Sequence, residues 1–159
     1  DTIEHCTWLT GPGQLDLRDN VAIRMAAMDI AACSTSSRNW RAMVERMGDE
    51  LANRVYGRLP WLEEHGVPLL AGTDAGLPGS VFDDAVGALE LYEWLGFPRR
   101  RILEIATEDS ARGVGLGAVT GRLEAGFSAD VLVVGGDPLA DLGALRDVRL
   151  VMIHGRAAA

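Results

Sequence analysis

Apolar residues recur at three- and four-residue steps through much of the chain, and the longest such stretch spans residues 38–65. Its apolar positions are Trp40, Met43, Val44, Met47, Leu51, Val55, Leu59 and Leu62. This spacing places them on one face of an amphipathic helix. Gly57 and Pro60 lie inside the segment, and we expect them to kink or divide the helix.

Shorter helices are predicted on both sides of this segment. The pattern favours a loop at residues 10–13 and helices over residues 15–28, 81–95 and 98–106. Gly96 is expected to end one of these helices and Pro98 to begin the next. Thr107, which two acidic residues follow, is expected to be the N-cap of a separate short helix that ends near Val114.

Strands are predicted between these helices. The run from Val67 to Ala71 is continuously apolar before the chain reaches Asp74, and residues 29–35 form a run of small residues that ends in polar ones. A continuously apolar strand is typical of a parallel sheet that is buried on both faces. The alternation with helices predicts an α/β fold, the C-terminal part of a (β/α)8 barrel, in which catalytic groups lie at the C-terminal ends of the strands.

The pattern changes near residue 118. A turn-rich stretch over residues 121–130 is followed by short β-branched runs at Val131 to Val134 and Val151 to Ile153, which are typical of strands. We therefore expect two domains. Residues 1–118 would be part of a barrel, and residues 119–159 would be part of a small β domain.

Composition narrows the class of protein. The 159 residues include 15 basic and 23 acidic side chains, a net charge of −8, which disfavours binding to nucleic acid or anionic lipid. No apolar stretch approaches the roughly 20 residues of a membrane span. Cys6 and Cys33 lack the spacing of a metal knuckle, so we expect reduced, buried cysteines in a cytoplasmic protein.

The start of the chain suggests a piece of a longer protein, because it lacks an initiator Met and begins just before a predicted strand end. Part of a barrel would leave unpaired strand edges and an open apolar interior, which favour association. The expected partners are the N-terminal remainder of the protein and, through the same edges, a second copy in a homo-oligomer.

Two residues at strand ends carry the candidate chemistry. Asp74 follows the apolar run, and His5 ends the first predicted strand, so both are candidate metal ligands at the same end of a barrel. The alternative for Asp74 is an ordinary turn built from glycine and aspartate. The alternative for His5 is a surface or core histidine without chemistry.

Ser34 and Thr35 follow the intervening strand and are candidates for contact with a substrate. A turn into the next helix explains them equally well. His65 is expected at a helix C-terminus and His154 at the surface, while Arg99 to Arg101 are expected to be a solvated run of charge.

Three blocks of sequence together resemble the amidohydrolase superfamily, in particular its imidazolonepropionase-like and metal-dependent carboxypeptidase (prolidase-like) branch. Residues 1–6, Asp-Thr-Ile-Glu-His-Cys, resemble the sixth-strand motif, and residues 71–76, Ala-Gly-Thr-Asp-Ala-Gly, resemble the eighth-strand motif. Residues 121–134 with Asp137-Pro138-Leu139 resemble the β-sandwich tail. The resemblance implies strands 6 to 8 of the barrel and roughly the C-terminal 40% of an enzyme of typical barrel size.

The resemblance also implies a reaction. It makes His5 a metal ligand, and Asp74 both a metal ligand and the general base and acid of a hydrolase that cleaves a C–N bond in an amide, peptide or cyclic amidine. The cofactor would be a divalent metal, most simply zinc, as one or two ions, and the substrate a small molecule or a dipeptide.

The family's remaining ligands, an HxH pair, a bridging Lys or carboxylate and a further His, are absent from these residues. Catalytic zinc sites usually have three protein ligands, so this segment alone is expected to be inactive. Two alternatives stay open. The segment is a noncatalytic module that completes a barrel with a separate chain, or it belongs to a heterocycle deaminase of the same superfamily.

Overall fold

The computed structural model of the chain describes residues 1–77 and 80–158. Its centre is a parallel sheet of the strands β1 (Thr2–Glu4), β4 (Ala31–Cys33) and β5 (Leu69–Leu70), in the order β1-β4-β5. Ile3 pairs with Ala32, and Ala32 pairs with Leu69. The strand of small residues therefore lies in the middle, between the strands that lead to His5 and Asp74.

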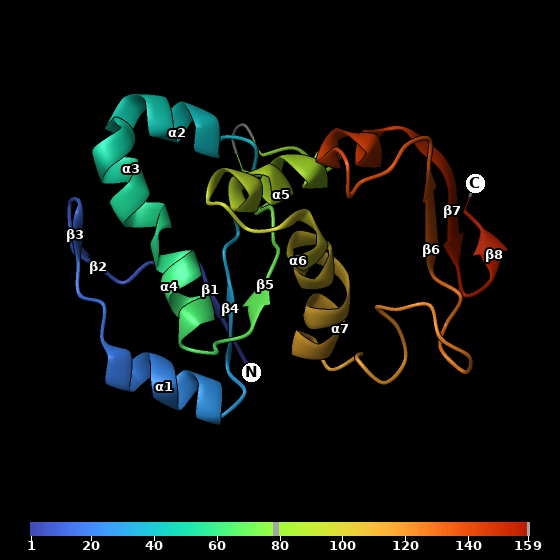
Figure 1. The fold of residues 1–159 in the computed structure, drawn as a ribbon, viewed down its shortest axis with the longest axis horizontal. Helices are drawn as coiled ribbons and strands as arrows, with labels where there is room; N and C mark the ends of the chain where they lie inside the picture. The colour runs from blue at the N-terminus through green and yellow to red at the C-terminus, as the bar shows by residue number, and fades with distance from the viewer. Residues whose placement is uncertain (78–79, 159) are drawn as a thin grey trace.

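Helices separate these strands along the chain, and Figure 1 shows them around the sheet. The middle strand is buried over its whole length, as are both residues of β5. Apolar residues of the helices pack on this sheet to form the core, among them Leu59, Leu62, Leu91, Tyr92, Ile102 and Ile105. The mixed α/β prediction agrees with this arrangement.

The long helix expected over residues 38–65 consists of three helices, α2 (Trp40–Met47), α3 (Asp49–Tyr56) and α4 (Arg58–Glu64). Gly48, at φ 76°, separates the first two, a break that the periodicity did not reveal. Gly57 separates the last two, as expected. Pro60 lies in the first turn of α4, where its missing N–H costs no helical hydrogen bond, so it does not divide the helix.

The segment before the first helix differs from the prediction. The expected loop at residues 10–13 belongs to a hairpin of β2 (Leu9–Gly11) and β3 (Gln14–Leu15), with Gly13 at φ 68° in its turn. Leu15 is therefore in a strand, and α1 (Asp19–Ala27) begins four residues later than expected.

The second half of the helical region begins with α5 (Ala85–Trp94). The Asp84 carboxylate accepts a hydrogen bond from the Gly87 N–H at 2.9 Å and so caps this helix. Gly96, at φ 87°, lies just past its C-terminus, where a glycine was expected to end it. Pro98 is the N-cap of α6 (Arg99–Glu104).

Thr107 does not begin a new helix. The chain continues from α6 through a π-helical turn (Ile105–Asp109) into α7 (Ser110–Gly113). The Thr107 hydroxyl donates to the Leu103 carbonyl at 2.7 Å, a bond within the helix rather than a cap.

The arginine run at the start of α6 is paired rather than merely solvated. Arg101 forms ion pairs with Glu63 and with the buried Asp109. Arg99 pairs with Glu93 at 2.6 Å. These pairs link α6 to α4 and α5, contacts that only the folded structure brings together.

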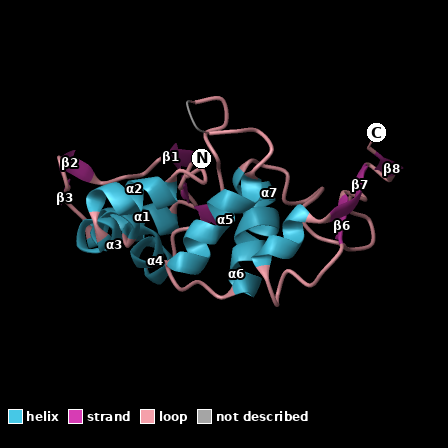
Figure 2. Ribbon diagram, turned by 90° about the horizontal axis from the view of Figure 1, so that it is seen from above, coloured by secondary structure: helices cyan, strands magenta, loops and turns pink. Residues whose placement is uncertain are grey.

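An antiparallel sheet of β6 (Val131–Val134), β7 (Val148–Ile153) and β8 (Arg156–Ala157) forms the end of the chain, in the order β6-β7-β8. Figure 2 shows α1 to α4 at one end of the molecule, α5 to α7 in the middle, and this sheet at the other end. A 3-10 turn (Leu142–Arg146) links the two parts: Leu142 is buried in the core, and Arg146 pairs with Glu90 of α5. Among the described residues, no helix combines the length and apolar character needed to cross a membrane.

Candidate metal and proton-transfer site

His5 and Asp74 lie side by side at the C-terminal end of the parallel sheet. His5 follows directly after β1, and Asp74 follows β5 by four residues. The His5 Nε2 atom is 3.7 Å from the Asp74 Oδ2 atom, and the two side chains are 57% and 36% exposed. Residues almost seventy positions apart thus lie together at one exposed end of the sheet. We call this exposed end, with His5, Thr35 and Asp74, the opening.

The backbone at this opening is unusual. His5, Thr35 and Asp74 have φ angles of 62°, 44° and 54°, in the left-handed region that residues other than glycine rarely adopt. One such residue follows the end of each parallel strand. Left-handed conformations outside glycine cost free energy, and they concentrate at functional sites. The shared conformation turns the chain sharply where each strand ends.

Thr35 contacts His5 directly. The Thr35 Oγ1 atom is 2.7 Å from the His5 Nδ1 atom. In the tautomer that donates from Nδ1 to this hydroxyl, the Nε2 lone pair is free on the side that faces Asp74. Metal-binding histidines are commonly oriented by such a hydrogen bond from the second ring nitrogen.

Ser34 lies differently from Thr35. Its side chain is buried, with 3% of the residue exposed, so its hydroxyl does not reach the opening in this structure. The sequence grouped the two residues because they are adjacent. Both residues, however, lie beyond the end of β4, and the left-handed backbone of Thr35, at φ 44°, gives the two side chains different directions.

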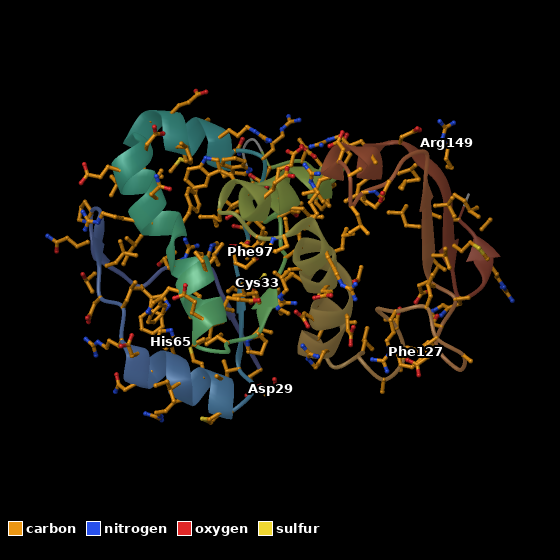
Figure 3. All side chains as sticks on the ribbon, viewed as in Figure 1. Asp29, Cys33, His65, Phe97, Phe127 and Arg149 are labelled. Carbon is orange, nitrogen blue, oxygen red and sulfur yellow. The ribbon has the colours of Figure 1, made fainter. Side chains whose placement is uncertain are left out.

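Cys33 and Gly72 explain how the Asp74 segment approaches β4. Figure 3 labels Cys33 in the helical part of the molecule, apart from Phe127 and Arg149 in the C-terminal part. A Cβ atom on Gly72 would lie 2.7 Å from the Cys33 Sγ atom, closer than atoms can approach.

Burial, together with a hydrogen bond to Glu4, raises the pKa of the Cys33 thiol to about 12. The thiol is therefore protonated at neutral pH and is no nucleophile.

Three side chains that sequence reasoning missed support the backbone of the site. Tyr92 is fully buried and donates its hydroxyl hydrogen to the Leu70 carbonyl at 2.9 Å. Ser80 donates to the Thr73 carbonyl, and Arg58 donates to the carbonyls of His5 and Cys6. No motif marks them, because each side chain acts on a backbone carbonyl of another segment, and Tyr92 and Arg58 do so across more than twenty residues.

The donor set fits part of a metal site. Two ligands of a tetrahedral zinc ion, at the usual bond lengths, lie about 3.4 Å apart, close to the 3.7 Å between His5 Nε2 and Asp74 Oδ2. Within residues 1–77 and 80–158, however, no group of three or more His, Cys, Asp or Glu side chains is placed to hold a metal. The described residues thus place two candidate ligands side by side, fewer than the three protein ligands that a catalytic zinc site usually has.

The sequence profile of the amidohydrolase family matches residues 1–158. The chain belongs to the amidohydrolase family. Proteins of Mycobacterium tuberculosis and Mycobacterium bovis that are named only as uncharacterized are 35% identical to this amidohydrolase chain over 109 residues, which are 67% of the chain and 28% of each relative. The matched segment is thus a minor part of those proteins.

Solved structures show the same fold. A Xaa-Pro dipeptidase with methionine bound in its active site superposes with a TM-score of 0.78 at 22% identity, over 99% of this chain and 39% of that protein. A Bifidobacterium longum protein provisionally assigned as a prolidase gives 0.77 at 27% identity, over 99% and 42%. A prolidase in complex with N-methylphosphonate-L-proline gives 0.76 at 20% identity, over 99% and 40%. The chain therefore spans about two fifths of the length of these amidohydrolases.

The other two histidines of this amidohydrolase chain lie away from the opening. His65 is the C-cap of α4, with Nδ1 2.8 Å from the Trp61 carbonyl oxygen and Nε2 3.2 Å from Asp19 Oδ1. His154 lies in the turn before β8, where its Nδ1 is 2.8 Å from the Ser128 hydroxyl. Both have local contacts that account for their positions.

Proposed function

We propose that the chain is the C-terminal portion of a metal-dependent amidohydrolase that hydrolyses a C–N bond, in an amide, a peptide or a cyclic amidine. In this proposal β1, β4 and β5 are strands 6 to 8 of a (β/α)8 barrel within residues 1–118, and residues 119–159 belong to a β-sandwich. The observation that carries the proposal is the 3.7 Å distance between His5 Nε2 and Asp74 Oδ2 at the sheet's C-terminal end.

His5 and Asp74 would hold a divalent ion, with zinc as the first candidate and one or two ions in the complete enzyme. Such an ion lowers the pKa of a bound water and polarises a carbonyl group. The remaining ligands would come from the part of the protein that precedes these residues. The proposed partner of this segment is therefore that N-terminal part, and the proposed location is the cytoplasm.

The chain's own residues have separate tasks in this reaction. Asp74 accepts a proton from the attacking water and returns it to the departing amine, since its carboxylate is accessible and lies beside the ligand nitrogen of His5. Thr35 orients the His5 ring through the bond to Nδ1. Of the two candidate substrate contacts, the proposal keeps Thr35, whose hydroxyl reaches His5, and not the buried Ser34.

The proposed substrates are small amides and dipeptides. The names of the Xaa-Pro dipeptidase and the prolidases favour a dipeptide whose second residue is proline. An acidic chain with net charge −8 is consistent with a small substrate rather than a nucleic acid.

A noncatalytic assembly role is the second candidate. It is favoured by the donor set, because the described residues supply two metal ligands rather than three. In that case the intact protein would carry the segment as scaffold, without bound metal and without turnover.

Turnover by the intact protein that contains this chain tests the proposal. With zinc present, we expect hydrolysis of a panel of Xaa-Pro dipeptides to be lost in Asp74→Asn, with the fold retained, because the amide cannot accept the proton. His5→Ala should first lower the zinc content, measured by elemental analysis.

Asp83→Asn is the matched control, since Asp83 is an exposed aspartate nine residues further along. We expect its kcat to stay near that of the wild type. Near-normal kcat in Asp74→Asn, or unchanged zinc content in His5→Ala, would contradict the proposed roles. A metal-free, inactive wild type would favour the assembly role.

A further inference from the structure

Arg58, the first residue of α4, is one of the most deeply buried charged residues of the chain. It is 3% exposed, and its guanidinium donates hydrogen bonds to backbone carbonyls from two separate segments. The Nε atom donates to Cys6 O at 3.1 Å, and Nη2 donates to His5 O at 3.3 Å. The Nη1 atom donates to Val55 O at 2.7 Å, on the preceding helix.

The two distant carbonyls belong to the turn that presents the His5 imidazole. His5 and Cys6 have φ angles of 62° and 41°, two consecutive left-handed residues without a glycine. The Cys6 N–H donates to Glu4 O at 2.7 Å, which closes a tight turn immediately after β1. Such a backbone persists only where its surroundings hold it in place. Arg58 supplies a hydrogen-bond donor to each residue of this turn.

Burying the charged guanidinium of Arg58 costs free energy. Burial lowers the pKa of the Arg58 guanidinium, which nevertheless remains charged at neutral pH. Among the described residues, no ion pair joins it to a carboxylate. Three carbonyl oxygens accept its hydrogen bonds, and its guanidinium carbon lies 5.8 Å from the centre of the Tyr56 ring. A buried positive charge without a carboxylate partner is rare. The guanidinium has a rigid, planar set of donors that reaches three carbonyls at once, and a lysine ammonium cannot reproduce this geometry.

We propose that Arg58 is a positioning residue, which directs the His5 imidazole toward Asp74 by stabilising the left-handed turn at His5 and Cys6. The inference rests on the proposed function, because His5 needs an orientation only as a ligand. The inference adds Arg58 on α4, more than fifty positions from His5, to the two candidate ligands His5 and Asp74.

The test compares Arg58→Lys and Arg58→Met with the wild type in the intact protein. Zinc affinity is measured by competition with a chelator, and the geometry of the ligands is followed by the visible absorption of the cobalt(II)-substituted protein. Arg54→Met is the control, because Arg54 is an exposed arginine of the same helical region. Thermal unfolding reports whether each variant is folded.

We expect both Arg58 variants to bind zinc about 10-fold or more weakly, as for the loss of other groups that orient a metal ligand. Their cobalt spectra should change while Arg54→Met keeps both properties. If Arg58→Met does not fold, Arg58→Lys decides the question, since it keeps the charge and the length of the side chain. Wild-type affinity and an unchanged spectrum in a folded Arg58→Lys would overturn the inference.

A separate readout distinguishes this inference from the proposed function. Hydrogen exchange of the Cys6 amide, measured without metal, reports on the turn itself. Faster exchange in the Arg58 variants than in Arg54→Met would show that Arg58 stabilises the turn, and a wild type that binds no zinc would then contradict the proposed function rather than this contact. Equal exchange rates would count against it even if the enzyme is active.

Discussion

Gly72 shows how one residue without a side chain shapes the opening. Its Cα carries no Cβ, so the segment that leads to Asp74 packs directly on Cys33 and Thr35. In the sequence this glycine belongs to the block Gly-Thr-Asp-Ala-Gly, where it is indistinguishable from an ordinary turn glycine. In the structure, position 72 requires a glycine because the backbone there lies close to the end of β4.

Gly72→Ala should destabilise the protein by about 1–3 kcal/mol, because the new methyl group would overlap the Cys33 sulfur. Chemical denaturation measures the change in the free energy of unfolding. Gly11→Ala is the control, since a Cβ there meets only the Gln14 side chain at 3.4 Å.

Adding Cys33→Ala to Gly72→Ala completes a double-mutant cycle. We expect the second change to recover much of the lost stability, because it removes the overlapping sulfur. Strictly additive effects of the two substitutions would show that the overlap is not the cause.

The sequence placed the strands of the parallel sheet better than it placed the helix boundaries, although it missed the hairpin of β2 and β3. The continuous apolar run and the run of small residues placed β5 and β4 because burial on both faces leaves a local signature. The predicted helix boundaries were wrong at Gly48 and Thr107, for opposite reasons. The periodicity of residues 38–65 continues through a break at Gly48, and a good capping sequence at Thr107 was overridden by packing of a continuous helix.

The candidate site was predictable only in part, for the same physical reason. His5 and Asp74 follow parallel strands, and residues that follow parallel strands lie at the same end of the sheet. Arg58 and Tyr92 donate hydrogen bonds to backbone carbonyls that lie more than twenty residues away in the sequence. Such contacts depend on the packing of α4 and α5 against the sheet, which no local pattern encodes.

Glu90 on α5 links three elements through ion pairs. It accepts hydrogen bonds from Arg41 of α2 and from Arg146 of the 3-10 turn, at 2.8 and 2.6 Å. Partial burial raises the pKa of the Glu90 carboxyl, but the bonds from Arg146 and Arg41 outweigh it and leave the pKa below its ordinary value. The ionised form is therefore favoured in the folded chain.

The sign of this shift predicts an acid-dependent loss of stability. A carboxyl whose pKa is lowered by folding adds stability above its unfolded pKa, about 4.3, and loses it as the pH falls through the lower folded value. We expect Glu90→Gln to be less stable than the wild type at pH 7, with the difference shrinking below about pH 4.

Unfolding by urea at several pH values measures this difference. Glu45→Gln is the control, since Glu45 is exposed on α2, and its curve should follow the wild type. Parallel curves for Glu90→Gln and the wild type across the acid range would show that the arginine pairs do not lower the pKa of Glu90.

At the scale of the whole molecule, the chain is one part of an amidohydrolase. It covers 39% of the Xaa-Pro dipeptidase and 42% of the Bifidobacterium protein, yet nearly all of its own length superposes on them. The parallel sheet has β1 and β5 at its two edges, and each edge leads directly to one of the candidate ligands. In the proposed function, the remaining ligands would approach this same end of the sheet.

The most direct measurement is the position of zinc in the intact protein that carries this chain, from anomalous diffraction at the zinc absorption edge. We expect a zinc peak about 2.0–2.2 Å from both His5 Nε2 and an Asp74 carboxylate oxygen, or a pair of peaks with one bound by each residue. Zinc bound elsewhere, with His5 and Asp74 still in contact and unligated, would contradict it.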